Sequence, residues 1–98
     1  MLKICVLEDE SLPLERMKAY LHQFQIEHSD FEYMLETYSS AFDLLEHYSR
    51  DVDLLFLDIR LPDMSGMEAA KRIREIDQNV MILFVTNLTQ YAIEGYSV

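Results

Sequence analysis

The sequence predicts an α/β fold built around a parallel β-sheet with helices on both faces. Two observations predict this fold: short apolar runs alternate along the chain with segments of helical periodicity, and three of those runs are apolar almost throughout. Strands of that composition are typical of sheets that are covered on both faces. The chain has 98 residues, so we expect one domain.

The first strand and helix come from the first 24 residues. An apolar run at residues 2–7 is suited to a buried strand, and residues 11–24 carry apolar side chains at helical spacing. Ser11 is the expected N-cap of this helix, and Pro13 is tolerated in its first turn, where backbone N–H groups lack intrahelical partners. The apolar face of the predicted helix consists of Leu14, Met17, Leu21 and Phe24.

A second strand and a second helix follow. Residues 31–39 alternate between apolar and polar side chains, as a half-buried strand does. Apolar side chains then recur at the i, i+3, i+4, i+7 spacing of an amphipathic helix, at Ala41, Leu44, Leu45 and Tyr48. This helix is expected to begin near Ser39 or Ser40, because serine is a preferred N-cap.

The second half of the chain repeats the pattern. Residues 52–57 and residues 80–85 are two further apolar runs that predict strands. Between them, helical spacing is marked by Met67, Ala70, Ile73 and Ile76. The start of this helix is well signalled, because Ser65 and Glu68 have the spacing of a capping box. Residues 89–98 predict one more short helix.

The charge balance limits what the segment can bind. Eighteen acidic residues against eight basic ones give a formal net charge of −10. A nucleic-acid interface needs basic side chains to meet phosphates, so we do not expect this segment itself to bind DNA. The balance is compatible with cations, or with a basic partner surface.

Cys5 is the one cysteine and lies within an apolar run, so we expect it to be a small buried hydrophobe. A single cysteine cannot form an internal disulfide, which makes a reducing compartment the natural expectation. No apolar run approaches membrane-spanning length, and no secretory leader opens the sequence. We therefore expect a soluble cytoplasmic protein that makes no membrane contact.

Acidic and polar residues follow three of the predicted strands. Glu8, Asp9 and Glu10 come after the first run, Asp58 ends the third, and Thr86 follows the fourth. Ligands of open α/β sheets bind beyond the carboxyl ends of the strands, close to the point where strand order reverses. If the strands that carry these residues are neighbours, their side chains converge at one edge of the sheet.

Each of these features alone has an ordinary structural explanation. An aspartate at a strand end is often a turn former or a helix cap, and an acidic run is usually a solvated turn. Their conjunction favours a site, because like charges packed together raise one another's pKa unless a cation joins them. Mg²⁺ typically binds through one or two carboxylates together with phosphate oxygens and waters. The sequence therefore predicts a site for a hard cation, of which Mg²⁺ is one.

Three stretches carry a resemblance to a known family: VLEDE (6–10), DLLFLDIRLPDMSGMEAAKRIR (53–74) and ILFVTN (82–87). With them, the whole chain resembles the receiver domain of bacterial two-component response regulators. The resemblance implies a flavodoxin-like three-layer sandwich with strand order 2-1-3-4. The ending YAIEGYSV is similar to the LytTR-type subgroup, whose receivers precede a DNA-binding domain.

The resemblance also implies a role for each site residue. Asp58 would accept a phosphoryl group from a phosphohistidine on a sensor histidine kinase. Asp9 would bind Mg²⁺ directly, Glu8 directly or through water, and further ligands would come from Asp58 and the backbone carbonyl of Arg60. The hydroxyl of Thr86 would turn onto the phosphoryl oxygens and move the following loop and helix, which switches a transcriptional output.

The sequence departs from the family pattern in one respect. Residues 1–98 contain no fifth strand, no lysine at its end and no fifth helix, since Lys18 and Lys71 fall in predicted helices. We therefore expect a receiver domain over residues 1–98 that is incomplete at its C-terminus, with impaired phosphoryl uptake. DNA would be reached only through an output domain outside this segment. The strand at residues 80–85 would be an apolar edge that invites self-association.

Two other functions remain open at this point. A receiver-like scaffold would act by docking alone, which the retained acidic residues oppose and the missing lysine favours. A phosphohydrolase with Asp58 as its nucleophile would need a second aspartate two residues later, and that position holds Arg60. We therefore expect a signalling phosphoacceptor and not an enzyme.

Overall fold

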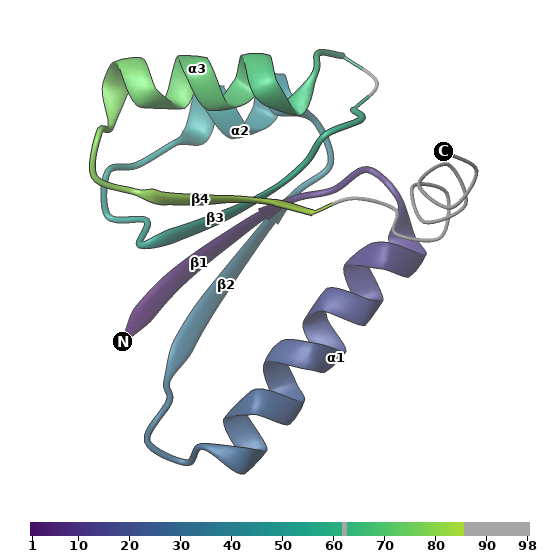
Figure 1. Ribbon diagram of the computed structural model, residues 1–98, viewed down its shortest axis with the longest axis vertical. Coiled ribbons are helices and arrows are strands. Elements are labelled where there is room, and N and C mark those ends of the chain that lie inside the picture. The colour runs from purple at the N-terminus through teal and green to yellow at the C-terminus, as the bar shows by residue number, and fades with distance from the viewer. Residues whose placement is uncertain (62, 86–98) are drawn as a thin grey trace, which may run out of the picture.

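The computed structural model describes residues 1–61 and 63–85. Within them the chain forms a four-stranded parallel sheet in the order β2-β1-β3-β4, with three helices (Figure 1). The predicted flavodoxin-like α/β fold and strand order 2-1-3-4 are confirmed. In chain order the elements are β1 (Leu2–Leu7), α1 (Ser11–Glu27), β2 (Tyr33–Tyr38), α2 (Ala41–His47), β3 (Leu54–Asp58), α3 (Gly66–Ile76) and β4 (Met81–Val85).

The register of the sheet brings the candidate site together. β1 is central and pairs with β2 on one side and β3 on the other, with Leu7 opposite Leu57. Asp58 is the last residue of β3 and pairs with Val85 at the end of β4. Since all strands are parallel, their carboxyl ends meet at one edge, and the residues that follow β1 lie beside Asp58.

The main hydrophobic core lies between the sheet and the helices α2 and α3, which Figure 1 shows together on one side. Cys5 is fully buried in this core, and burial raises the pKa of its thiol to about 12, so it is a poor nucleophile at neutral pH. The prediction of a small buried hydrophobe at this position is confirmed. The core cluster comprises Cys5, Leu7, Ala41, Leu44, Val52, Leu55, Leu57, Ala69, Ile73 and Val80.

The helix α1 lies on the opposite side of the sheet (Figure 1) and none of its residues is fully buried. The predicted N-cap was wrong by one residue: Glu10 is the N-cap, its side chain makes no capping hydrogen bond, and Ser11 is already helical. The carboxylate of a glutamate is too far from its own backbone to cap as serine does. Pro13 lies in the first turn, as predicted, and Phe24 is exposed on the predicted apolar face.

The strand β4 does not match the expectation that apolar strands are covered on both faces. Met81 is 60% exposed and Leu83 44% exposed, whereas the core strands β1 and β3 keep their apolar residues mostly buried. The reason is positional, because β4 is an edge strand among the described residues and has a partner only in β3.

The starts of α2 and α3 follow the sequence. Ser40 caps α2 by accepting from the N–H of Asp43 at 3.2 Å, and Ser65 caps α3 by accepting from the N–H of Glu68 at 3.1 Å. The helix predicted at residues 89–98 lies outside the described residues. Among those described, no helix is long and apolar enough to cross a membrane.

Candidate functional site

Three carboxylates converge at the carboxyl ends of the central strands. Glu8 and Asp9 follow β1, Asp58 ends β3, and one carboxylate oxygen from each lies within 4.8 Å of the others. Residues fifty positions apart in sequence thus meet because β1 and β3 are adjacent and parallel. This is the cluster that the strand-end pattern predicted.

The three carboxylates differ in their exposure to water. Asp9 is exposed and Asp58 half-buried, but Glu8 is only 9% exposed. Burial, followed by its close approach to Asp58, raises the pKa of Glu8 to about 7, although the N–H of Glu10 donates to its Oε2 at 3.3 Å. Protonation of Glu8, or a cation beside it, would therefore be favourable near neutral pH.

The donor set fits a hard divalent cation. Carboxylate oxygens on two neighbouring segments, with one aspartate open to water, are the ligands that Mg²⁺ takes together with waters. A cation here would relieve the mutual repulsion of the three carboxylates and the cost of burying Glu8. The cluster offers no imidazole or thiolate, so the softer ligands typical of structural zinc sites are missing from it.

The loop after Asp58 is shaped by close backbone contacts. The Arg60 N–H donates to Oδ1 of Asp58 at 3.2 Å, and the Gly66 N–H donates to the carbonyl of Ile59 at 2.9 Å. A Cβ on Gly66 would lie 2.2 Å from the carbonyl oxygen of Asp58, so only glycine permits this approach. The start of α3 therefore packs directly on the backbone of the predicted acceptor.

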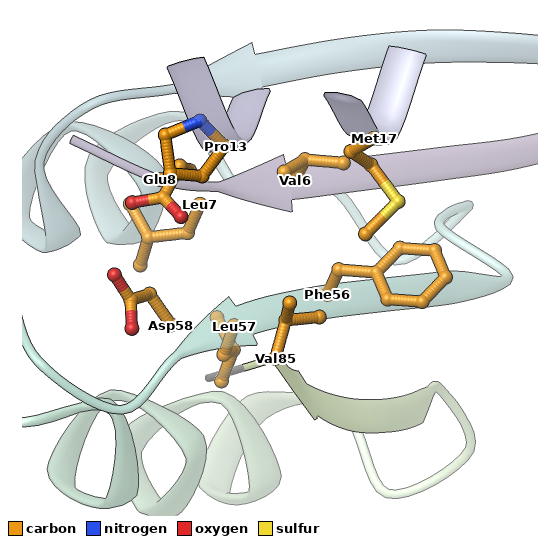
Figure 2. Close-up of a pocket in the computed structure, with 9 residues that line it drawn as sticks. All are labelled: Val6, Leu7, Glu8, Pro13, Met17, Phe56, Leu57, Asp58 and Val85. Atoms are coloured by element: carbon orange, nitrogen blue, oxygen red, sulfur yellow. The ribbon is translucent and has the colours of Figure 1, made fainter. Parts of the chain in front are cut away.

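A small pocket opens beside the carboxylates, between α1 and the sheet. Figure 2 shows the carboxyl groups of Glu8 and Asp58 at one end of it, with Pro13 and Met17 of α1 on one side and Phe56 on the strand below. The apolar lining explains why Glu8 is desolvated although it lies at the edge of the sheet.

The remaining predicted site residues have different outcomes. Arg60 lies in the loop, exposed, with its backbone within the segment that follows Asp58. Thr86 lies outside the described residues. One contact was missed: the carboxylate of Asp63 accepts hydrogen bonds from the start of α2. No local sequence pattern predicts this contact, because the partners of Asp63 are more than twenty residues away.

The fold and the site together define a flavodoxin-like domain with an acidic site at the carboxyl edge of its sheet. Residues 4–98 match the response regulator receiver domain family, and the chain belongs to that family. Receiver domains are signalling modules.

Two curated relatives match along nearly the whole chain. The sensory transduction protein LytT of Bacillus subtilis (strain 168) is 32% identical over all of it, and the transcriptional regulatory protein NatR of the same organism is 31% identical over 98% of it. The match spans only 39% of LytT and 40% of NatR, so the chain corresponds to about two-fifths of these relatives. Both belong with the LytTR-type regulators that the YAIEGYSV ending indicated.

A solved structure gives the same fold. The response regulator TrrA from Thermotoga maritima, in complex with Mg²⁺ and a beryllofluoride, is 29% identical, with a TM-score of 0.75 over 93% of this chain and 74% of that one. TrrA has also been solved in complex with the histidine kinase ThkA, and that copy is 30% identical with a TM-score of 0.71 over 89% of this chain and 70% of its own.

Proposed function

We propose that this chain accepts a phosphoryl group on Asp58 from a sensor histidine kinase, in a transfer that depends on Mg²⁺. The observation that carries the proposal is the convergence of Glu8, Asp9 and Asp58 within 4.8 Å at the end of the two central strands. The TrrA structures support it, since that relative was solved with Mg²⁺ and a beryllofluoride and with a histidine kinase.

Four groups would hold the metal. Asp9 and Asp58 offer accessible carboxylate oxygens, Glu8 would bind directly or through water, and the carbonyl of Arg60 lies in the loop that follows Asp58. When bound, Mg²⁺ neutralises charge on the transferring group, which is most of what phosphoryl transfer requires. The raised pKa of Glu8 supports this assignment, because a buried carboxylate of that kind gains from a cation.

The chain itself supplies the nucleophile and its placement. An oxygen of Asp58 forms the new bond to phosphorus as the bond from phosphorus to the kinase histidine breaks, giving an acyl phosphate. The N–H of Arg60 donates to Oδ1 of Asp58 at 3.2 Å, which orients the carboxylate and leaves Oδ2 for the attack. Gly66 keeps the start of α3 close behind, which limits the positions Asp58 can take.

The output is a change of conformation after phosphorylation. The hydroxyl of Thr86 would bind the phosphoryl oxygens and move the loop and helix that follow, as a local charge change biases a bistable segment. The chain would control transcription in the cytoplasm through an output domain, since its curated relatives are longer regulators. Contact with DNA would belong to that domain and not to these acidic residues.

One experiment tests the proposal against its alternatives. Mg²⁺ and a beryllofluoride are added to the isotope-labelled chain, and the amide resonances of Asp9, Thr86 and Asn87 are followed by NMR. We expect saturable shifts that Asp58→Asn abolishes, because the amide removes the anionic oxygen while keeping the side-chain shape. Shifts that persist in Asp58→Asn would contradict the acceptor role, and no shift in either protein would favour a docking scaffold. Phosphate release with turnover from a small phosphodonor would favour a phosphohydrolase.

A further inference from the structure

Asp63 connects the loop that follows Asp58 to the start of α2. No step of the proposed transfer uses this side chain. Its half-buried carboxylate accepts three hydrogen bonds from the start of α2. The Phe42 N–H donates to Oδ2 at 2.9 Å, the Ser40 hydroxyl donates to the same oxygen at 3.1 Å, and the Ala41 N–H donates to Oδ1 at 3.3 Å. These bonds, led by that from Phe42, hold the pKa of Asp63 below its usual range.

These bonds complete the first turn of α2. The N–H of Asp43 already bonds to the Ser40 side chain, and the N–H of Leu44 bonds to the Ser40 carbonyl at 3.1 Å. Asp63 supplies the partners for the two N–H groups that remain, on Ala41 and Phe42. Because three donors on one helix end bind a single carboxylate, the position of Asp63 is fixed relative to α2.

The loop is therefore held at two points. Asp63 ties it to α2, and the Gly66 N–H bonds back to the carbonyl of Ile59 at 2.9 Å. Arg60, whose carbonyl is a proposed metal ligand, lies between Ile59 and Asp63 in sequence. Mg²⁺ demands near-ideal octahedral geometry at short distances, so a small displacement of this loop would weaken its binding.

We propose that Asp63 is a positioning residue: by binding the first turn of α2 it holds the loop of Asp58 and Arg60 in the geometry that the Mg²⁺ and phosphoacceptor site needs. This inference rests on the proposed function for its metal. The coupling is reciprocal, so metal binding at the loop also stabilises the start of α2. Nothing in the family resemblance assigned a role to this position.

The test compares Asp63→Ala and Asp63→Asn with the wild-type chain and with Tyr48→Phe. Tyr48 lies at the far end of α2 and donates to Asp77 at 2.6 Å, so its loss destabilises the same helix without touching the loop. Mg²⁺ affinity is measured by NMR titration under conditions where each variant is folded. Hydrogen exchange is measured at the amides of Phe42 and Gly66, with and without Mg²⁺.

We expect Asp63→Ala to weaken Mg²⁺ binding roughly tenfold, because loss of a group that orients metal ligands typically costs ten- to a hundredfold. Asp63→Asn should recover part of the affinity, since its amide oxygen can still accept from Phe42. Tyr48→Phe should keep its Mg²⁺ affinity within about twofold of the wild type. The reason is that Tyr48 lies outside the tether, which consists of the hydrogen bonds of Asp63 with Ser40, Ala41 and Phe42. Mg²⁺ should slow exchange at Phe42 in the wild type and not in Asp63→Ala.

A merely structural role for Asp63 would give another result: the alanine variant would lose stability and keep its Mg²⁺ affinity, as Tyr48→Phe does. That outcome would overturn the inference. Exchange at Gly66 without metal separates this failure from that of the proposed function. If the wild type binds no Mg²⁺ while Asp63→Ala accelerates exchange at Gly66 and Tyr48→Phe does not, the tether stands and the proposed function falls. Unchanged exchange at Gly66 in Asp63→Ala would reject the tether whether or not the chain binds Mg²⁺.

Discussion

At the scale of single residues, the buried carboxylate of Glu8 lowers the stability of the fold at the position where the proposed site needs a metal ligand. Glu8 is almost fully buried beside Asp58, and its pKa of about 7 means that ionising it in the folded chain is unfavourable. A hydrophobic core rarely contains such a group. The proposed metal site would gain from it, because the carboxylate that destabilises the metal-free fold would contribute binding energy to a cation.

The raised pKa of Glu8 predicts that the stability of the chain depends on pH. A carboxyl group whose folded-state pKa is raised binds more protons in the folded state, so stability is lost as pH rises from about 4.5 to about 7. Glu8→Gln should remove this slope and stabilise the metal-free chain at pH 8 by about 1–3 kcal/mol. Urea denaturation at pH 5, 6, 7 and 8 measures it.

The control for Glu8 is the metal itself. Saturating Mg²⁺ should raise the stability of the wild type at pH 8 and have a much smaller effect on Glu8→Gln, and a chelator should reverse the change. A wild-type stability that stays level between pH 5 and pH 8 without metal would show that Glu8 is not the destabilising group.

Replacing Gly66 with alanine should change stability in the direction opposite to the one that helix propensity alone predicts. At an unobstructed helical position alanine is more stable than glycine by about 1 kcal/mol. Here the added Cβ would lie 2.2 Å from the Asp58 carbonyl oxygen, so we expect Gly66→Ala to destabilise the chain by about 1–3 kcal/mol and to weaken Mg²⁺ binding. Urea denaturation with a Mg²⁺ titration checks both effects, and Lys71→Gly, at an exposed position of α3, calibrates propensity. A more stable Gly66→Ala would mean that the loop yields without cost.

At the scale of elements, what could be predicted divides by the range of the interaction. Strand and helix positions, the caps Ser40 and Ser65, and the meeting of Glu8 with Asp58 follow from local periodicity and from the rule that parallel strands share a carboxyl edge. The contact of Asp63 with α2 joins residues more than twenty positions apart, and no local pattern encodes it.

Burial was also less predictable than element position. The helical spacing of α3 was clear in the sequence, but its buried residues are Gly66, Ala69 and Ile73, whereas Met67 is 53% exposed. The reason is that an apolar side chain marks a helical face only when something packs against that face. Hydrophobicity alone does not state which neighbours are present.

A hydrogen bond joins the ends of α2 and α3, and the effect of removing it can be predicted. The Tyr48 hydroxyl donates to Oδ2 of Asp77 at 2.6 Å, and this bond is the first cause of the lowered pKa of Asp77. Tyr48→Phe should destabilise the chain by about 1.5–3 kcal/mol at pH 7, as expected for a bond to a charged group. NMR titration should find the pKa of Asp77 closer to its usual value in this variant.

The sign of the pH effect follows from the lowered pKa. The contribution of Asp77 is present at neutral pH and is lost as pH falls through its folded-state pKa, so wild type and Tyr48→Phe should converge in stability under acid conditions. Tyr20→Phe, on the exposed side of α1, is the matched control and should change nothing. Because the substitution keeps the ring, a constant difference between wild type and Tyr48→Phe at all pH values would show that the hydroxyl acts independently of the charge on Asp77.

At the scale of the whole molecule, the described sheet has two edges of different character. β2 exposes Met34 but alternates with polar side chains, whereas β4 exposes three apolar ones, Met81, Leu83 and Phe84. Edge strands of the second kind present both unpaired backbone groups and apolar surface to another chain. The asymmetry places any tendency to self-associate at β4.

We therefore expect the 98-residue polypeptide to associate with itself through β4. Sedimentation equilibrium should give an average mass that rises with concentration, and Leu83→Lys should lower it by placing a charge where a second strand would pack. Met34→Lys adds the same charge to the other edge strand and should leave the association intact, which controls for net charge. The mass of the polypeptide should fall toward the monomer only when β4 carries the lysine, because only there does the added charge lie where a second strand would pair. A monomer at every concentration, or equal effects of the two lysines, would assign the exposed side chains of β4 no part in assembly.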